Sequence, residues 1–197
     1  MKAWLIAAAA AASLSLAGCQ PAPPPPVFQA TDITGAAFAR GFTLTDHNGQ
    51  TRTLADFKGK AVAMFFGYVH CPDVCPTTLS DFAAALQQLG AQAQQVQVIF
   101  VTVDPQRDTP DLLKQFVPAF HPEFLGMYTD AESLKQLAHE YKVVFQKTAV
   151  KAPDDYLIDH SAGTYIYDPQ GRLRLLMPYG SRPEVIAHDL GVLLAAP

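Results

Sequence analysis

Cysteine is scarce in this chain. Its 197 residues include three cysteines, Cys19, Cys71 and Cys75, so a fold held together by a network of disulfide bonds is excluded. The chain also lacks internal repeats and long runs of charge of one sign. Its formal net charge is −4 at pH 7, and a mildly acidic domain with scattered charge is not typical of nucleic-acid binding. Beyond the N-terminus, no apolar run suggests a membrane span.

The first residues have the features of an export signal. Lys2 supplies a positive charge, residues 5–16 are apolar but too short to span a bilayer comfortably, and Leu16-Ala17-Gly18 places small residues before Cys19. This pattern resembles the lipobox of bacterial lipoproteins, in which the signal is cleaved before the cysteine and that cysteine is acylated. We therefore expect residues 1–18 to be a lipoprotein signal peptide. An ordinary secretory signal with an unrelated cysteine is the alternative.

A proline-rich segment, residues 21–26, follows the expected lipidation site. Such a segment favours extended polyproline II structure and acts as a semi-rigid spacer. We assign residues 19–38 to the lipidated cysteine and this linker, and residues 39–197 to one globular domain, a length that suits one core. Lipid on Cys19 would anchor the domain to a membrane on the extracytoplasmic, periplasmic side of a bacterial cell envelope. Either the inner or the outer membrane would fit.

The apolar pattern of the domain predicts alternating strands and helices. Their order is a hairpin, then βαβα, then ββα, which is the order of a thioredoxin-like α/β fold with an added N-terminal β-hairpin and a mid-domain insertion. Strands are predicted at 42–46, 51–54, 61–68, 96–103, 143–146, 164–167 and 173–177. Helices are predicted at 76–89, from Pro110 onward, and at 130–141 and 183–194.

The two remaining cysteines, Cys71 and Cys75, lie four positions apart in His70-Cys71-Pro72-Asp73-Val74-Cys75-Pro76. They directly follow the predicted buried strand at 61–68, and open α/β sheets place their chemistry at such strand ends. A disulfide across so short a loop would constrain the unfolded chain little, so its structural value is small. We interpret the two cysteines as a redox pair or as ligands of a soft metal ion.

His160 is the third candidate ligand. It lies just before the predicted strand at 164–167, in a loop that packs beside the cysteine loop in thioredoxin-like folds. Oxidoreductases of that fold usually carry a proline in this loop, and residues 159–164 contain none. Two thiolates and one imidazole favour copper, as Cu(I) or Cu(II), by ligand softness. Structural zinc would usually take a fourth protein ligand, for which Asp73 and His70 are the candidates.

Three segments, in this order, resemble the Sco/SenC family. They are Cys71-Pro72-Asp73-Val74-Cys75-Pro76, Val103-Asp104-Pro105-Gln106-Arg107-Asp108-Thr109-Pro110 and Asp159-His160-Ser161. The resemblance covers nearly the whole domain from about residue 39. It implies a copper-binding assembly factor that delivers copper to, or reduces cysteines of, the dinuclear copper centre of cytochrome c oxidase. It also implies that Cys71, Cys75 and His160 are the copper ligands. The expected partners are the copper domain of cytochrome c oxidase subunit II or another copper chaperone.

Two functions of another class stay open. One is a thiol–disulfide oxidoreductase that reduces partner cysteines without metal, with Cys71 as the attacking thiolate. The other is a peroxidase-like relative of thioredoxin. The spacing of the cysteines and the missing proline count against efficient general thiol exchange.

The remaining candidate residues are given structural or supporting roles. Asp104, Arg107 and Asp108 are interpreted as a strand end and a helix N-cap, with Asp108 or Thr109 as the capping residue. Alternatively, a pair of Arg107 with Asp104 orients the cysteine loop or tunes its thiols. Apolar surroundings place three methionines in the core, and predicted turns or helix faces place four histidines at the surface. These residues are Met64, Met127, Met177, His47, His121, His139 and His188.

Overall fold

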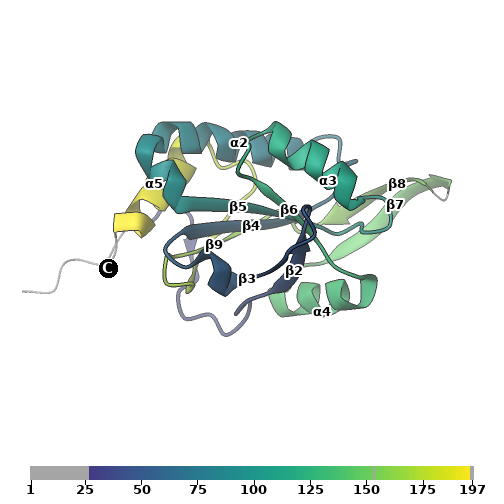
Figure 1. The fold of residues 1–197 in the computed structure, drawn as a ribbon, viewed down its shortest axis with the longest axis horizontal. Helices are drawn as coiled ribbons and strands as arrows, with labels where there is room; N and C mark the ends of the chain where they lie inside the picture. The colour runs from purple at the N-terminus through teal and green to yellow at the C-terminus, as the bar shows by residue number, and fades with distance from the viewer. Residues whose placement is uncertain (1–26, 153, 196–197) are drawn as a thin grey trace, which may run out of the picture.

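One mixed sheet organises the described part of the chain, residues 27–152 and 154–195 of a computed structural model (Figure 1). Its eight strands follow the order β1-β10-β9-β4-β5-β6-β2-β3. β4, β5 and β6 are parallel to one another, and the other neighbouring pairs are antiparallel. The strands are β1 (Thr31–Asp32), β2 (Thr43–Asp46), β3 (Thr51–Thr53), β4 (Ala61–Gly67), β5 (Val96–Thr102), β6 (Leu125–Tyr128), β9 (Thr164–Tyr167) and β10 (Leu173–Met177).

Helices cover both faces of this sheet, so the central strands β4 and β5 are buried along their whole length. In Figure 1, α2, α3 and α5 lie above the sheet and α4 lies below it. Successive side chains of β4 therefore enter different cores: Phe65 packs with the α2 side, whereas Phe66 packs against Tyr141 of α4. The helices are α2 (Val74–Leu89), α3 (Pro110–Phe116), α4 (Ala131–Tyr141) and α5 (Pro183–Ala195), with short 3-10 turns η1 (Leu54–Phe57), η2 (Gly90–Gln95) and η3 (Val117–Ala119).

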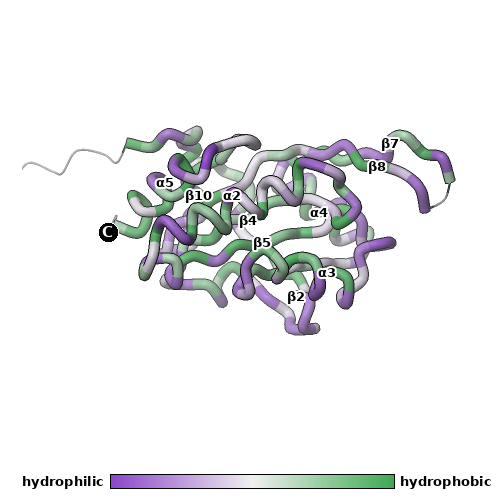
Figure 2. Tube along the Cα trace, turned by 90° about the horizontal axis from the view of Figure 1, so that it is seen from above, coloured by the Kyte–Doolittle hydropathy of each residue, from purple (hydrophilic) through white to green (hydrophobic). Residues whose placement is uncertain are grey.

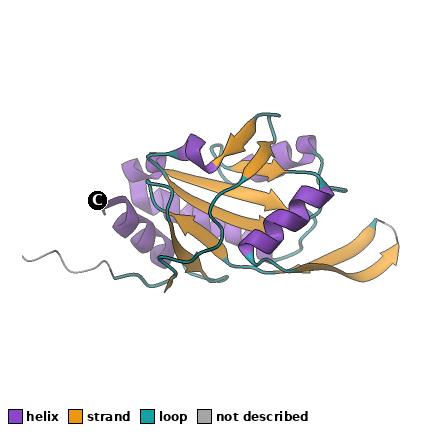
Figure 3. Cartoon of the chain, turned by 90° about the horizontal axis from the view of Figure 1, so that it is seen from below, coloured by secondary structure: helices purple, strands orange, loops and turns teal. Residues whose placement is uncertain are grey.

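A separate two-stranded hairpin, β7 (Phe145–Ala152) and β8 (Asp155–His160), projects from the body of the molecule (Figure 3). Polar and apolar stretches follow one another along it, whereas β5 is apolar along most of its length (Figure 2). Most of β7 is exposed, while β8 alternates between exposed and inward-facing residues. β8 thus faces the body with one side and solvent with the other.

Most predicted elements are confirmed within one or two residues, and the differences are the start of α2, the β7–β8 hairpin and the short strands β1 and β6. α2 begins at Val74 rather than Pro76, because a proline fits in the first turn of a helix, where its missing N–H costs nothing. The predicted strand at 143–146 is the longer β7. β8 and the short strand β6 were not expected. The predicted loop before β9 therefore contains the end of a strand.

The segment before residue 39 belongs partly to the packed domain. β1 pairs with β10, and the side chain of Phe28 packs against the core cluster on the α2 and α5 side. The buried carboxylate of Asp189 in α5 accepts hydrogen bonds from the backbone N–H groups of Gln29, at 3.0 Å, and Ala30, at 2.8 Å. The domain thus begins earlier than the expected boundary.

The expected signal peptide, the lipidated Cys19 and the proline-rich residues 21–26 lie outside the described residues. Among the helices that the structure does describe, none combines the length and apolar character that a bilayer span requires.

His47 corrects one surface assignment, because its exposed fraction is 8%. Its Nδ1 atom accepts a hydrogen bond from the backbone N–H of Gly126 in β6 at 3.1 Å, and burial lowers the pKa of the imidazole. The contact was missed because β6 was not expected. His139 and His188 are exposed and His121 is half-buried, whereas the three methionines assigned to the core are buried as predicted.

Replacing Asp189 tests how the N-terminal segment is held. Asp189→Ala removes the acceptor of two backbone N–H groups, so we expect the free energy of unfolding to fall by about 1–3 kcal/mol and proteolysis before residue 33 to accelerate. Urea unfolding and limited proteolysis measure the two effects. Glu184→Gln, at an exposed position of the same helix, is the matched control. Equal stability of both variants and the parent would contradict the role given to Asp189.

Candidate metal centre

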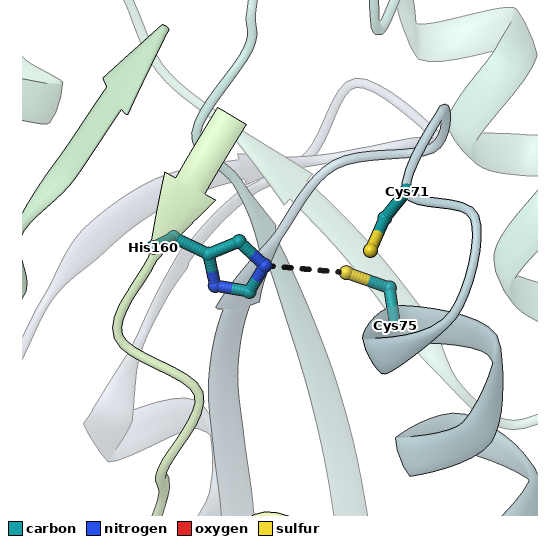
Figure 4. A group of neighbouring side chains, drawn as sticks. All are labelled: Cys71, Cys75 and His160. Carbon is teal, nitrogen blue, oxygen red and sulfur yellow. Dashed lines mark hydrogen bonds between the residues drawn. The ribbon is translucent and has the colours of Figure 1, made fainter. Parts of the chain in front are cut away.

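The side chains of Cys71, Cys75 and His160 lie together at the carboxyl end of β4 (Figure 4). Cys71 lies in the loop between β4 and α2, Cys75 in the first turn of α2, and His160 is the last residue of β8. Their candidate ligand atoms lie within 4.8 Å of one another. Cys75 Sγ is 3.7 Å from His160 Nε2. The fold therefore joins residues that are 85 positions apart.

A glycine at the end of β4 makes room for one of the sulfurs. A Cβ atom added to Gly67 would lie 2.6 Å from Cys75 Sγ and 2.9 Å from a ring carbon of Phe100. Both distances are too short for a real Cβ. The chain then turns, with the N–H of Cys71 donating to the carbonyl of Tyr68 at 3.2 Å. The sulfur of Cys75 thus lies directly against the strand end.

The imidazole of His160 is oriented by its own neighbour. Nδ1 lies 3.0 Å from the carbonyl oxygen of Ser161, and a carbonyl accepts hydrogen bonds, so Nδ1 carries the proton. Nε2 is then unprotonated and faces the two sulfurs, the arrangement that a metal-ligating histidine requires. The ring of Tyr68 packs edge-on against this imidazole, with ring centroids 5.9 Å apart.

The two thiols have opposite electrostatic environments. The pKa of Cys71 is lowered to about 4, first because the Cys75 thiol donates a hydrogen bond to its sulfur, with help from backbone N–H groups of residues 73 and 75. The pKa of Cys75 is raised, first by the same contact with Cys71 and then by burial. Both cysteines are free in the structure. Of the two sulfurs, Cys71 is thus the one that favours the thiolate form.

Asp108 ties the cysteine loop to the end of β5. Its carboxylate, in a residue 1% exposed, accepts the N–H of Val69 at 3.0 Å and the hydroxyl of Thr102 at 2.6 Å. Its other oxygen lies 3.8 Å from Nδ1 of His70. Burial raises the pKa of this carboxyl group. Of the two predicted capping residues, Thr109 caps α3, whereas Asp108 joins the cysteine loop to β5, a contact that the sequence did not predict.

Arg107 and Asp104 form an ion pair that reaches a different element. The guanidinium contacts the carboxylate of Asp104 and donates hydrogen bonds to carbonyl oxygens at the start of β8. It also stacks on the ring of Tyr156, 3.5 Å from the centroid. The pair therefore holds the hairpin that carries His160, and the sequence motif alone does not reveal this.

The donor set fits a soft metal ion. Two sulfurs and one imidazole nitrogen are ligands that copper favours. Asp73 and His70, the candidates for a fourth ligand, are not members of this group in the described chain. A structural zinc site normally has four protein ligands. The three-ligand arrangement is thus more typical of copper than of structural zinc.

Comparison with known proteins agrees with this geometry. The family model described as SCO1/SenC matches residues 30–195. The chain belongs to the SCO1/SenC family. The chain is similar to the solved structure of Bradyrhizobium japonicum ScoI with copper bound. The two sequences are 38% identical, the TM-score is 0.71, and the match covers 79% of this chain and 98% of that one. This likeness confirms the predicted thioredoxin-like fold class.

Curated Sco relatives come from mitochondria and bacteria. The human mitochondrial SCO2 homolog is 39% identical over 139 residues, which are 69% of this chain and 52% of the relative. The SCO2-like protein of Rickettsia felis is 34% identical over 152 residues, 76% of this chain and 73% of the relative. The chain spans about half the length of the mammalian relatives it matches.

Two tyrosines near the site were missed from the sequence. Tyr68 contacts the imidazole of His160, and Tyr156 lies under the guanidinium of Arg107. The alternation of Tyr156, Ile158 and His160 could have revealed Tyr156, because it places all three on the same face of a strand. It gives no signal for Tyr68, which follows β4.

The low pKa of Cys71 predicts selective alkylation of the reduced, metal-free protein. Because the thiolate is the reacting form, iodoacetamide should modify Cys71 at pH 6 and lose rate as the pH falls through about 4. Cys75→Ala removes the largest cause of the shift, so the loss of rate should move to higher pH. Mass spectrometry of the modified peptides gives the rates. Identical pH profiles for the two proteins would contradict the assigned cause.

Proposed function

We propose that this protein binds copper through Cys71, Cys75 and His160 and carries it as cargo for assembly of the dinuclear copper centre of cytochrome c oxidase. The observation that carries the proposal is the convergence of two sulfurs and one imidazole nitrogen within 4.8 Å. The family resemblance supplies the oxidase as the destination. The proposed partner is the copper domain of oxidase subunit II or another copper chaperone.

The described site suits a carrier that must release its cargo. Cys71 is already a thiolate, whereas Cys75 must lose a proton when metal binds, so loading releases protons and weakens as the pH falls. Cys75 is buried, but Cys71 and His160 are half-exposed. A partner's ligand can approach from that exposed side and replace the protein ligands one at a time.

We further propose that the domain is held at a membrane by lipid on Cys19, on the periplasmic side of a bacterial envelope. The support is the lipobox-like sequence and the proline-rich spacer that follows it. One or more lipid chains on a single cysteine would hold the domain at the surface without any spanning helix.

A second function, reduction of partner cysteines, is favoured by the low pKa of Cys71. Its thiolate would attack a partner disulfide and form a mixed disulfide, releasing one partner thiolate. Cys75 would lose its proton and attack Cys71, so that the partner leaves as a dithiol and Cys71–Cys75 becomes a disulfide. Once Cys71 is in the mixed disulfide, burial is the cause that still raises the pKa of Cys75, and it slows this second step. Oxidation would also remove both thiolate ligands, so the redox state would gate copper loading.

Copper affinity of single variants tests the ligand set. We expect Cys71→Ala, Cys75→Ala and His160→Ala each to weaken Cu(I) binding by more than about a hundredfold, because loss of a direct ligand costs more than loss of an outer contact. Competition with a chromophoric Cu(I) chelator measures the affinity, and circular dichroism checks the fold. His139→Ala removes an exposed imidazole of α4 as the control. Unchanged affinity in the folded His160→Ala variant would remove that residue from the site.

Transfer to an oxidase separates the two functions. The copper-loaded protein, mixed with the reduced apo copper domain of subunit II, should lose copper to it and generate the spectrum of the dinuclear centre. The metal-free protein, mixed with the oxidised domain, should reduce its disulfide if the second function holds. If copper stays on this protein and the metal-free protein reduces the disulfide quickly, the carrier function is contradicted and the reductase function is supported.

A further inference from the structure

Alternate residues of β8 form one row that faces the body of the molecule. Tyr156 and Ile158 are buried, and His160 continues the row at the end of the strand. The direction of the imidazole therefore depends on how β8 lies against the body. Tyr156 and Ile158 pack into the core cluster on the α4 side, whereas most of β7 is exposed, so the end of the strand that carries His160 depends on further contacts.

Two contacts fix β8 to the central sheet. The backbone N–H of Ile158 donates to the hydroxyl of Tyr68 at 3.2 Å. Nη1 of Arg107 donates to the carbonyl oxygens of Tyr156, at 3.0 Å, and Asp154, at 3.2 Å. Nη1 of Arg107 thus contacts the backbone of Tyr156, the first of the inward-facing residues of β8.

Arg107 is itself held rigidly. Its side chain is 9% exposed and pairs with Asp104, which is 2% exposed. The hydroxyl of Tyr156 donates to the second oxygen of Asp104 at 2.8 Å, and the Tyr156 ring lies 3.5 Å from the guanidinium carbon. Arg107, Asp104 and Tyr156 therefore form a closed ring of contacts between the end of β5 and the start of β8.

We propose that Arg107 is a positioning residue for the metal site: it clamps β8 to the end of β5 and thereby holds the imidazole of His160 against the two sulfurs. This inference rests on the proposed copper-binding function. It differs from the expected role of the pair, since the part that Arg107 positions is the histidine strand and not the cysteine loop. Asp108 holds the cysteine loop through separate contacts.

A double-mutant cycle tests whether Arg107 acts through His160. We expect Arg107→Ala to weaken Cu(I) binding about 10- to 100-fold, the usual cost of losing a residue that orients a ligand. In the His160→Ala background the same change should cost less than about twofold, because the oriented ligand is gone. Equal losses in both backgrounds would overturn the proposal and assign Arg107 a general structural role.

Two further variants control for folding and for charge. Lys147→Ala removes an exposed cation that lies over the same Tyr156 ring, 3.9 Å from its centroid, and whose ammonium group donates to the side chain of Gln106 rather than to the β8 backbone. This change should leave the affinity within about twofold of the parent. Arg107→Lys keeps the charge beside Asp104 but loses the planar fork. It replaces Arg107→Ala in the cycle if the alanine variant does not fold, with the same expected pattern.

The metal-free protein separates failure of the clamp from failure of the copper function. If the parent protein does not bind Cu(I), the proposed function fails. The clamp is then decided by nuclear Overhauser effects between the rings of Tyr68 and His160, expected in the parent and in Lys147→Ala and lost in the Arg107 variant. Persistence of these effects in a folded Arg107 variant would refute the clamp.

Discussion

Parallel pairing of β4 with β5 is the constraint on which the site depends. It brings the segments that follow the two strands to the same edge of the sheet, so the cysteine loop after Gly67 lies beside the motif after Thr102. The N–H of Val103 donates to the carbonyl of Gly67 at 2.8 Å, and the buried carboxylate of Asp108 spans the same junction. The sulfurs thus lie at the end of two strands that are buried along their whole length.

The imidazole of His160 is carried by β8, which is less buried than β4 and β5. It lies at the end of a projecting hairpin, which contacts the body through the buried side chains of Tyr156 and Ile158 and through a few polar contacts, while most of β7 stays exposed. Burying the Arg107–Asp104 pair costs desolvation energy, so we expect the pair to orient β8 more than it stabilises the fold. The site therefore combines a fixed half, made of two sulfurs, with an adjustable half, made of one ring.

The sequence predicts the central fold well because its signals are local. Continuous apolar runs mark β4 and β5, and Asp130 and Thr109 begin helices as capping residues do. The hairpin strand β8 escaped prediction because its alternation is short and mixes acidic with apolar residues. For the site, residue chemistry and the family resemblance selected Cys71, Cys75 and His160. The division of charge between the two sulfurs and the reach of Arg107 to β8 depend on three-dimensional neighbours, which spacing along the chain does not reveal.

The attachment of residues 28–32 has a geometric consequence. These residues are fixed to α5 and β10, at the opposite end of the long axis from the β7–β8 hairpin (Figures 1 and 3). If the proposed lipid on Cys19 tethers the domain, the tether enters at the end of the molecule far from the hairpin whose last residue is His160 (Figure 1). A partner protein could then reach the hairpin end of the domain without meeting the anchored end.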